Sequence, residues 1–233
     1  MSAPGPAESG RRLPRLHAVT DDEVLATPGW VERATAALGA GGADLALHLR
    51  GPHTDPGRLV DLLDTLLEPA SSSGALLLVN DRVDVALVGG ARGVHLGERS
   101  LPAERARALL GKDAWIGVSC HDASEARGPA AEGADSVFLG TIHPTATHPG
   151  AVGLGLDAVR RAVAVGGEPP LIGIGGIGLE KAPGVVAAGA YGVAAIRGIW
   201  RAEDPAEAVT QYLEGLSGQG EETWKRRKPF ISA

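Results

Sequence analysis

The sequence predicts a single (β/α)8 TIM barrel in the α/β class, and three observations lead to this prediction. The chain has 233 residues, of which 44% are hydrophobic and only 3% aromatic, so one large core must be built from aliphatic side chains. Short apolar runs alternate with helix-like segments, which is typical of parallel strand pairing. About eight such units are enough to close a barrel. An open doubly wound sheet is the alternative that the alternation leaves open.

The strands are expected where short apolar runs lead into polar or glycine residues. They are Leu16–Thr20, Asp44–Arg50, Ala75–Asn80, Gly93–Leu96, Trp115–Cys120, Ser136–Gly140, Leu171–Gly175 and Gly192–Ile196. Successive strand residues point to opposite faces, which puts Ala46, His48 and Arg50 on one face. The leucines between them should pack against helices, so we expect His48 and Arg50 to face the barrel axis. By the same rule, Ser119 and His121 share an inward face.

A helix is expected after each strand. The helices are Trp30–Leu38, Asp55–Glu68, Val83–Val88, Pro102–Leu110, Ser124–Glu132, Leu156–Val165, Lys181–Ala188 and Pro205–Leu216. Asp55 followed by Pro56 is the pattern of an N-cap residue and a proline in the first turn. The resulting order of elements is that of an eight-unit barrel.

Composition and the chain ends limit the function classes. Residues 1–13 are expected to form a flexible leader, 14–217 the barrel, and 218–233 a basic, solvated tail. The net charge of −6 argues against a nucleic-acid partner, although the basic run from Lys225 to Lys228 leaves that alternative for the tail. Without an apolar stretch of about 18 residues we expect no membrane partner. The single Cys120 excludes a disulfide framework and fits a cytoplasmic protein. The sequence leaves a homo-oligomer open.

A loop rich in hydrogen-bonding groups follows the sixth predicted strand. It runs from Gly140 to Gly150 and contains Thr145, Thr147 and His148. Because the chemistry of barrel enzymes lies at the carboxyl ends of the strands, these side chains are candidate substrate-binding residues.

A phosphate site is predicted after the last two strands. The apolar strand that begins at Leu171 ends in Gly175 and Gly176, whose backbone N–H groups could approach an anion. The final strand ends in Ile196 and Arg197, which adds a cation at the same rim. These loops are the recurrent phosphate site of the fold. Tight packing is the alternative explanation for the glycines.

The histidines divide by their position in the strands. His48 and His95 are expected to be buried hydrogen-bonding residues inside the barrel, whereas His17 and His53 are expected to be peripheral. His121 lies at the end of its strand, where substrate can arrive, and is the candidate acid/base. A zinc site of His48, His95 and His121 is an alternative, but no close-spaced ligand pair supports it.

Taken together, the motifs resemble one superfamily, that of thiamine phosphate synthase and its relative TenI, a thiazole tautomerase. The matching segments, all between Leu16 and Pro205, are His17–Asp21, His48–Arg50, Asn80–Ala86, Gly93–Gly97, Gly117–His121, Gly133–Asp135, Pro144–His148, Ile174–Ile177 and Ala188–Ala194. The resemblance implies a (β/α)8 barrel, in agreement with the count of units.

The resemblance also implies roles for individual residues. The synthase joins a pyrimidine diphosphate to a thiazole phosphate and releases pyrophosphate with the help of Mg²⁺. The positions that match its pyrimidine, metal and pyrophosphate residues are Arg50, Asn80, Asp81, Ser119, Thr145 and Thr147, with Asp81 as the metal ligand. Three positions differ: Pro52, Ser100 and His148 stand where the family has a lysine, an aspartate and a lysine. Arg197 stands where the family usually has serine.

These differences favour the tautomerase, because pyrophosphate departure needs cations and metal to neutralise charge. We therefore expect a TenI-like thiazole tautomerase, an isomerase that moves a proton on a phosphorylated carboxythiazole through His121. It would require no cofactor and would bind its substrate with His48 and Arg50 among other residues. The alternatives are a divergent thiamine phosphate synthase (thiamine-phosphate diphosphorylase) with Mg²⁺ on Asp81, and a noncatalytic sensor of a phosphorylated ligand.

Overall fold

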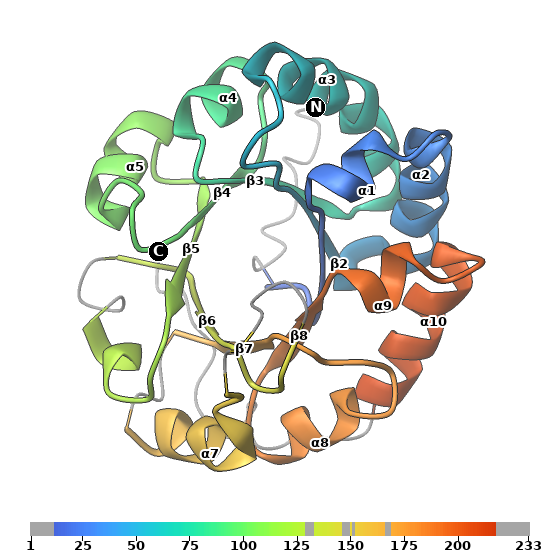
Figure 1. The fold of residues 1–233 in the computed structure, drawn as a ribbon. Helices are drawn as coiled ribbons and strands as arrows, with labels where there is room; N and C mark the ends of the chain where they lie inside the picture. Colours follow the sequence, from blue (N-terminus) through green and yellow to red (C-terminus); the bar gives the residue numbers. More distant parts are fainter. Residues whose placement is uncertain (1–11, 129–132, 146–149, 151, 166–168, 218–233) are drawn as a thin grey trace, which may run out of the picture.

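The chain folds as a closed barrel of eight parallel strands surrounded by helices (Figure 1). This computed structural model describes residues 12–128, 133–145, 150, 152–165 and 169–217. The strands follow one another in chain order, and β8 pairs with β1 to close the ring. The predicted (β/α)8 TIM barrel is therefore confirmed, and the open sheet is excluded.

Each strand lies within one residue, at either end, of the range expected from the sequence. The strands are β1 (Leu16–Val19), β2 (Leu45–Leu49), β3 (Leu76–Asn80), β4 (Gly93–Leu96), β5 (Trp115–Cys120), β6 (Ser136–Leu139), β7 (Leu171–Ile174) and β8 (Gly192–Ala195). The agreement follows from the alternation, because a strand buried on both faces ends where glycine or polar residues begin.

The helices cover the outside of the strands. They are α1 (Asp22–Ala26), α2 (Trp30–Gly41), α3 (Pro56–Ser73), α4 (Val83–Val88), α5 (Ala103–Leu110), α7 (Gly155–Val165), α8 (Ala182–Ala187), α9 (Arg197–Trp200) and α10 (Pro205–Leu216), with 3₁₀ turns η1 (Gly42–Asp44) and η2 (Glu125–Arg127). The short α1 and α9 were not expected. The helix expected over Ser124–Glu132 is represented by η2, and residues 129–132 lie outside the described part of the chain.

Helix α3 begins where its sequence predicts, but it continues to Ser73, beyond the end expected at Glu68. The Asp55 carboxylate accepts the N–H groups of Gly57 and Arg58 at 2.9 and 3.3 Å, so it satisfies donors that the first turn leaves without a partner. Gly74 ends the helix at φ +80°, a conformation that costs glycine little.

Two apolar layers hold the barrel together. The outer layer lies between strands and helices and includes Leu45, Leu47 and Leu49 of β2. The inner layer fills the barrel and includes Ala46 and Phe138. The leucines of β2 therefore face the helices, and the residues between them face the axis, as the alternation predicted.

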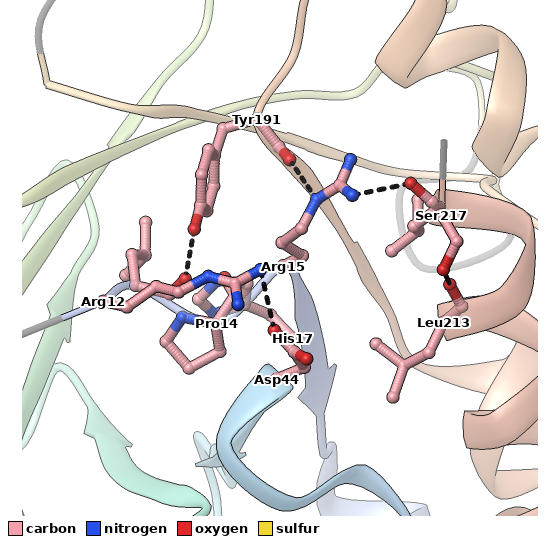
Figure 2. Close-up of polar contacts among 10 residues, drawn as sticks. Arg12, Pro14, Arg15, His17, Asp44, Tyr191, Leu213 and Ser217 are labelled. Carbon is pink, nitrogen blue, oxygen red and sulfur yellow. Dashed lines mark hydrogen bonds and ion pairs between the residues drawn. The ribbon is translucent and has the colours of Figure 1, made fainter. Parts of the chain in front are cut away.

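The floor of the barrel, at the amino ends of the strands, is closed by the segment that leads into β1 (Figure 2). Leu13 is buried, and its carbonyl accepts the Tyr191 hydroxyl at 2.5 Å. The guanidinium of the buried Arg15 donates to the carbonyls of Tyr191 and Leu216, at 3.2 and 2.6 Å. Arg12 pairs with Asp44 at 3.2 Å. These contacts join the start of the barrel to the end of α10. Within the described residues, no helix is long and apolar enough to cross a membrane.

Candidate active site

A cavity of about 1120 Å³ opens at the carboxyl ends of the strands. Most of the residues singled out from the sequence line it: His48, Arg50, Asn80, Asp81, Ser119, His121, Thr145, Gly175, Gly176, Ile196 and Arg197. Thr147 and His148 lie outside the described residues. The fold therefore brings residues from β2 to β8 together around one space.

Below the cavity, inside the barrel, lies a row of hydrogen-bonded side chains. His48 Nε2 lies 2.8 Å from His17 Nδ1, and His48 Nδ1 lies 3.1 Å from Asn80 Oδ1. At the other end, His17 Nε2 contacts the Pro14 carbonyl at 3.0 Å. Neither imidazole is exposed. The row runs from the barrel floor to the cavity wall.

Burial keeps these imidazoles neutral. It lowers the pKa of His48 to about 4, partly offset by the contact with Asn80. It holds the pKa of His17 well below the ordinary value, and the neighbouring His48 and His95 act in the same direction. His17 was expected to be peripheral, and that expectation is wrong: it lies on the inward face of β1, next to the ring of Phe138.

His95 forms a second branch inside the barrel. Its Nε2 lies 2.8 Å from the Ser119 hydroxyl, and its ring centroid lies 4.2 Å from that of Phe138. Burial holds the pKa of His95 well below its ordinary value. A zinc site that includes His48 and His95 is not compatible with this geometry, because both ring nitrogens of His48 are engaged by protein groups.

The carboxylate of Asp81 stands at the cavity wall in a fixed orientation. Asp81 has φ +63°, a conformation unusual for a residue other than glycine. Its Oδ1 accepts the Gly97 N–H at 2.9 Å and the Ser100 hydroxyl. Ser100, which stands where the family has a second carboxylate, therefore supports the first one.

Arginines supply the positive charge around the cavity. Those that line it are Arg50, Arg82, Arg99, Arg197 and Arg201. Arg197 Nη2 donates to the Thr145 hydroxyl at 2.9 Å, which joins the loop after β6 to the end of β8. Arg82 lies within the matching segment Asn80–Ala86 and Arg99 lies outside the matching segments, but the sequence comparison gave neither residue a role.

Packing explains why Gly175 and Gly176 are glycines. Their φ angles are +99° and +61°, in the region that disfavours other residues. A Cβ on Gly175 would come within 2.6 Å of Thr141, and one on Gly176 within 2.6 Å of the Pro144 carbonyl. The glycines are therefore needed where two loops meet, and their contact with phosphate stays a prediction.

His121 and Cys120 end β5 in different surroundings. The His121 side chain is 60% exposed, and its Nε2 lies 3.9 Å from a carboxylate oxygen of Glu98. Cys120 is buried in the outer layer, and burial raises the pKa of its thiol to about 12. Its thiol is therefore not an activated nucleophile, as its place on the helix side predicts.

Fold and cavity together define a (β/α)8 barrel protein with an arginine-lined site and one fixed carboxylate at the carboxyl ends of its strands. The chain belongs to the thiamine monophosphate synthase family, whose model matches residues 16–199. The resemblance inferred from the motifs is thereby confirmed.

Similar proteins carry the name of the synthase. A thiamine-phosphate synthase from Myxococcus xanthus is 42% identical over 214 residues, which cover 90% of this chain and 96% of that protein. One from Gloeobacter violaceus is 39% identical over 87% of this chain and 58% of its own length. A bifunctional ThiM/ThiE protein from Symbiobacterium thermophilum is 47% identical over 63% of this chain. The chain matches only 31% of that protein's length.

A solved structure supports the same family. The thiamine phosphate pyrophosphorylase from Pyrococcus furiosus is 30% identical, with a TM-score of 0.75 over 87% of this chain and 95% of that one. A 3-hexulose-6-phosphate synthase, 18% identical with a TM-score of 0.61, shares the fold.

The expectation of a TenI-like tautomerase, and with it of an isomerase, is wrong. Relatives about 40% identical over most of the chain are named thiamine-phosphate synthase. The expectation rested on Pro52, Ser100 and His148 as a loss of charge. In the structure Arg99 lines the same cavity as Pro52, Arg82 lines it while paired with Asp84, and Ser100 holds the Asp81 carboxylate in place.

Proposed function

We propose that this protein is a thiamine-phosphate synthase, a transferase that couples hydroxymethylpyrimidine diphosphate to thiazole phosphate and releases pyrophosphate in the cytoplasm. The observation that carries the proposal is the placement of the Asp81 carboxylate in the same cavity as five arginines. Such a site suits a small substrate with a diphosphate, because guanidinium groups match phosphate oxygens in geometry and charge.

Asp81 fits a Mg²⁺ ion that is carried largely by its substrate. Mg²⁺ in phosphate-transfer sites is usually bound by one or two carboxylates together with substrate phosphates and water. One Asp81 oxygen is engaged by Gly97 and Ser100, which fixes the carboxylate at the wall of the cavity. When bound, the ion would neutralise charge on the departing pyrophosphate.

Two sets of residues in the cavity would bind the two substrates. Arg50, Asn80 and Ser119 would bind the pyrimidine diphosphate. Arg197 and Thr145, which are hydrogen-bonded to each other, would hold the thiazole phosphate together with Gly175, Gly176 and Ile196. Thr147 and His148 would extend this binding loop. Residues 14–217 would form the catalytic domain, with 1–13 and 218–233 as flanking segments.

The test is a pyrophosphate-release assay with purified protein, hydroxymethylpyrimidine diphosphate, thiazole phosphate and Mg²⁺. We expect thiamine phosphate and pyrophosphate in equal amounts, at about 1 per second or faster. Omitting thiazole phosphate is the control for simple hydrolysis. Binding of both substrates without any product would overturn the proposal and favour a sensor.

A further inference from the structure

The hydrogen-bonded row from the Pro14 carbonyl to the Asn80 side chain needs more protons than its two neutral histidines can supply. Three contacts form the row: Pro14 carbonyl to His17, His17 to His48, and His48 to Asn80. Each hydrogen bond needs one proton between its two heavy atoms. A neutral imidazole brings one N–H, so the two histidines supply two protons for three contacts.

The Pro14 end of the row allows only one arrangement. A carbonyl oxygen only accepts, so His17 must carry its proton on Nε2. His17 Nδ1 is then an acceptor, and His48 must donate to it from Nε2. His48 Nδ1 is left as an acceptor. The only group that can supply the third proton without charging a buried imidazole is the NH₂ of Asn80.

The two ends of an asparagine amide are assigned from their hydrogen bonds, because oxygen and nitrogen have nearly the same shape. In the structure Oδ1 is turned toward His48, and with all three hydrogen bonds made in that orientation one of the two histidines would have to be a cation. Both are fully buried in an apolar layer around Phe138, and burial keeps their pKa values low. A buried, unpaired cation costs far more than turning an amide by half a rotation.

We propose that His17 and His48, in their Nε2–H tautomers, hold the Asn80 amide with its nitrogen toward His48, so that its oxygen is presented to the cavity as a hydrogen-bond acceptor. His17 and His48 are then positioning residues, and Asn80 determines specificity. It selects a ligand group that donates, such as an amino group on an aromatic ring, over a phosphate oxygen. This choice of ligand group rests on the proposed function, but the tautomers and the amide orientation do not.

The floor of the barrel sets the direction of the row. Tyr191 holds the Leu13 carbonyl, and Arg15 ties the same segment to α10, so the Pro14 carbonyl between them is fixed (Figure 2). An acceptor fixed at the floor thus determines which atom Asn80 turns toward the cavity, on the far side of the barrel. Each hydrogen bond passes the constraint to the next residue.

The test is a long-range ¹H–¹⁵N correlation spectrum of the full-length, ¹⁵N-histidine-labelled protein at pH 7 without substrate. Signals are assigned with single His→Gln variants. We expect His17 and His48 each to show one protonated nitrogen, at Nε2. A proton on His48 Nδ1, or a doubly protonated His17 or His48, would overturn the proposal. The wild-type spectrum decides, even where a buried variant fails to fold.

Two variants test the amide. Asn80→Asp replaces the donating NH₂ with a carboxylate oxygen, so we expect His48 to become doubly protonated at pH 7. Asn80→Leu is the matched control, because it removes the donor without adding a charge, and His48 should stay neutral. An unchanged His48 spectrum in Asn80→Asp contradicts the proposed orientation.

His17→Phe tests the positioning role. It removes the acceptor that keeps the His48 proton on Nε2, so the share of the Nε2–H form should fall. A purely structural role for His17 would leave that share unchanged. Because these spectra need no turnover, failure of the synthase assay and failure of this inference remain distinguishable.

Discussion

The interior of the barrel and its rim both contain polar side chains, but they treat charge in opposite ways. In the interior, burial keeps His17, His48 and His95 neutral. At the rim, an acidic side chain, Asp81, and five arginines line the cavity in which a ligand would bind. The difference teaches that the buried polar groups orient neighbouring side chains, whereas the charged groups at the rim are placed to bind a ligand.

Removing the central ring of the interior should have the largest effect. Phe138 is buried and contacts the rings of all three inner histidines. Phe138→Ala should lower the free energy of unfolding by about 3–5 kcal/mol, measured by urea denaturation. The control is Val152→Ala at a residue 90% exposed, which should change stability by less than about 0.5 kcal/mol. A comparable loss in both variants would contradict the division between interior and rim.

At the rim, Asp81→Asn should reduce turnover by about 100-fold or more, since it removes the fixed charge proposed to hold Mg²⁺. Asparagine tolerates the positive φ of Asp81, so the fold should be retained. The assay is pyrophosphate release at saturating substrates. Asp64→Asn is the matched control, because Asp64 is an exposed residue of α3 that does not line the cavity. If both variants lose activity equally, the role given to Asp81 is wrong.

Acid should weaken the fold through the interior. The pKa of His48 is about 4 when folded and about 6.5 when unfolded, so below pH 6.5 the unfolded chain binds the extra proton first. Stability is therefore retained above pH 6.5 and falls as the pH drops toward 4, by about 3 kcal/mol from this residue. Urea denaturation at several pH values measures the loss. A His48→Gln variant should show a shallower dependence, and an equal slope would contradict this account.

The contact between Arg197 and Thr145 gives a smaller effect on binding. Arg197→Lys keeps a positive charge but loses the planar fork, so the KM for thiazole phosphate should rise about 10-fold with little change in kcat. Arg160→Lys is the control, since Arg160 forms an exposed ion pair with Asp157 on α7. A fall in kcat at constant KM would place Arg197 in the chemical step instead.

The smallest effect is expected at His121. Its side chain is 60% exposed, and its Nε2 lies 3.9 Å from a carboxylate oxygen of Glu98. Since the proposed synthase step depends on neutralising pyrophosphate rather than on proton transfer by this ring, His121→Gln should change kcat/KM by less than about threefold. Steady-state kinetics decides, and a loss of about 100-fold would restore an acid/base role to His121.

The strands could be predicted from the sequence because their alternation is a local property. Helices α1 and α9 could not, since five and four residues are too few to show a helical period. His17 was missed because it was judged alone. The alternation that placed His48 inward also places His17 inward when it is applied to β1.

The sequence predicted the site residues whose position at a strand end was enough to place them, and missed those whose role depends on a partner distant along the chain. Arg50, Asn80 and Asp81 are at the cavity, as their places at strand ends indicated. Ser100 donates a hydrogen bond to Asp81, which is distant along the chain. The sequence showed only that a serine replaces the family's aspartate, so it did not reveal this contact. The cations of Arg82 and Arg99 likewise gain meaning only from the shared cavity.

The pairing of β8 with β1 closes the barrel, and the contact of Arg15 with the Leu216 carbonyl also brings the two ends of the barrel chain together. Its first and last described segments meet at the floor, opposite the cavity. A circularly permuted chain that links them and opens at the exposed turn around Gly111 should close the same ring. The cavity should therefore form whichever of the eight units comes first in the chain.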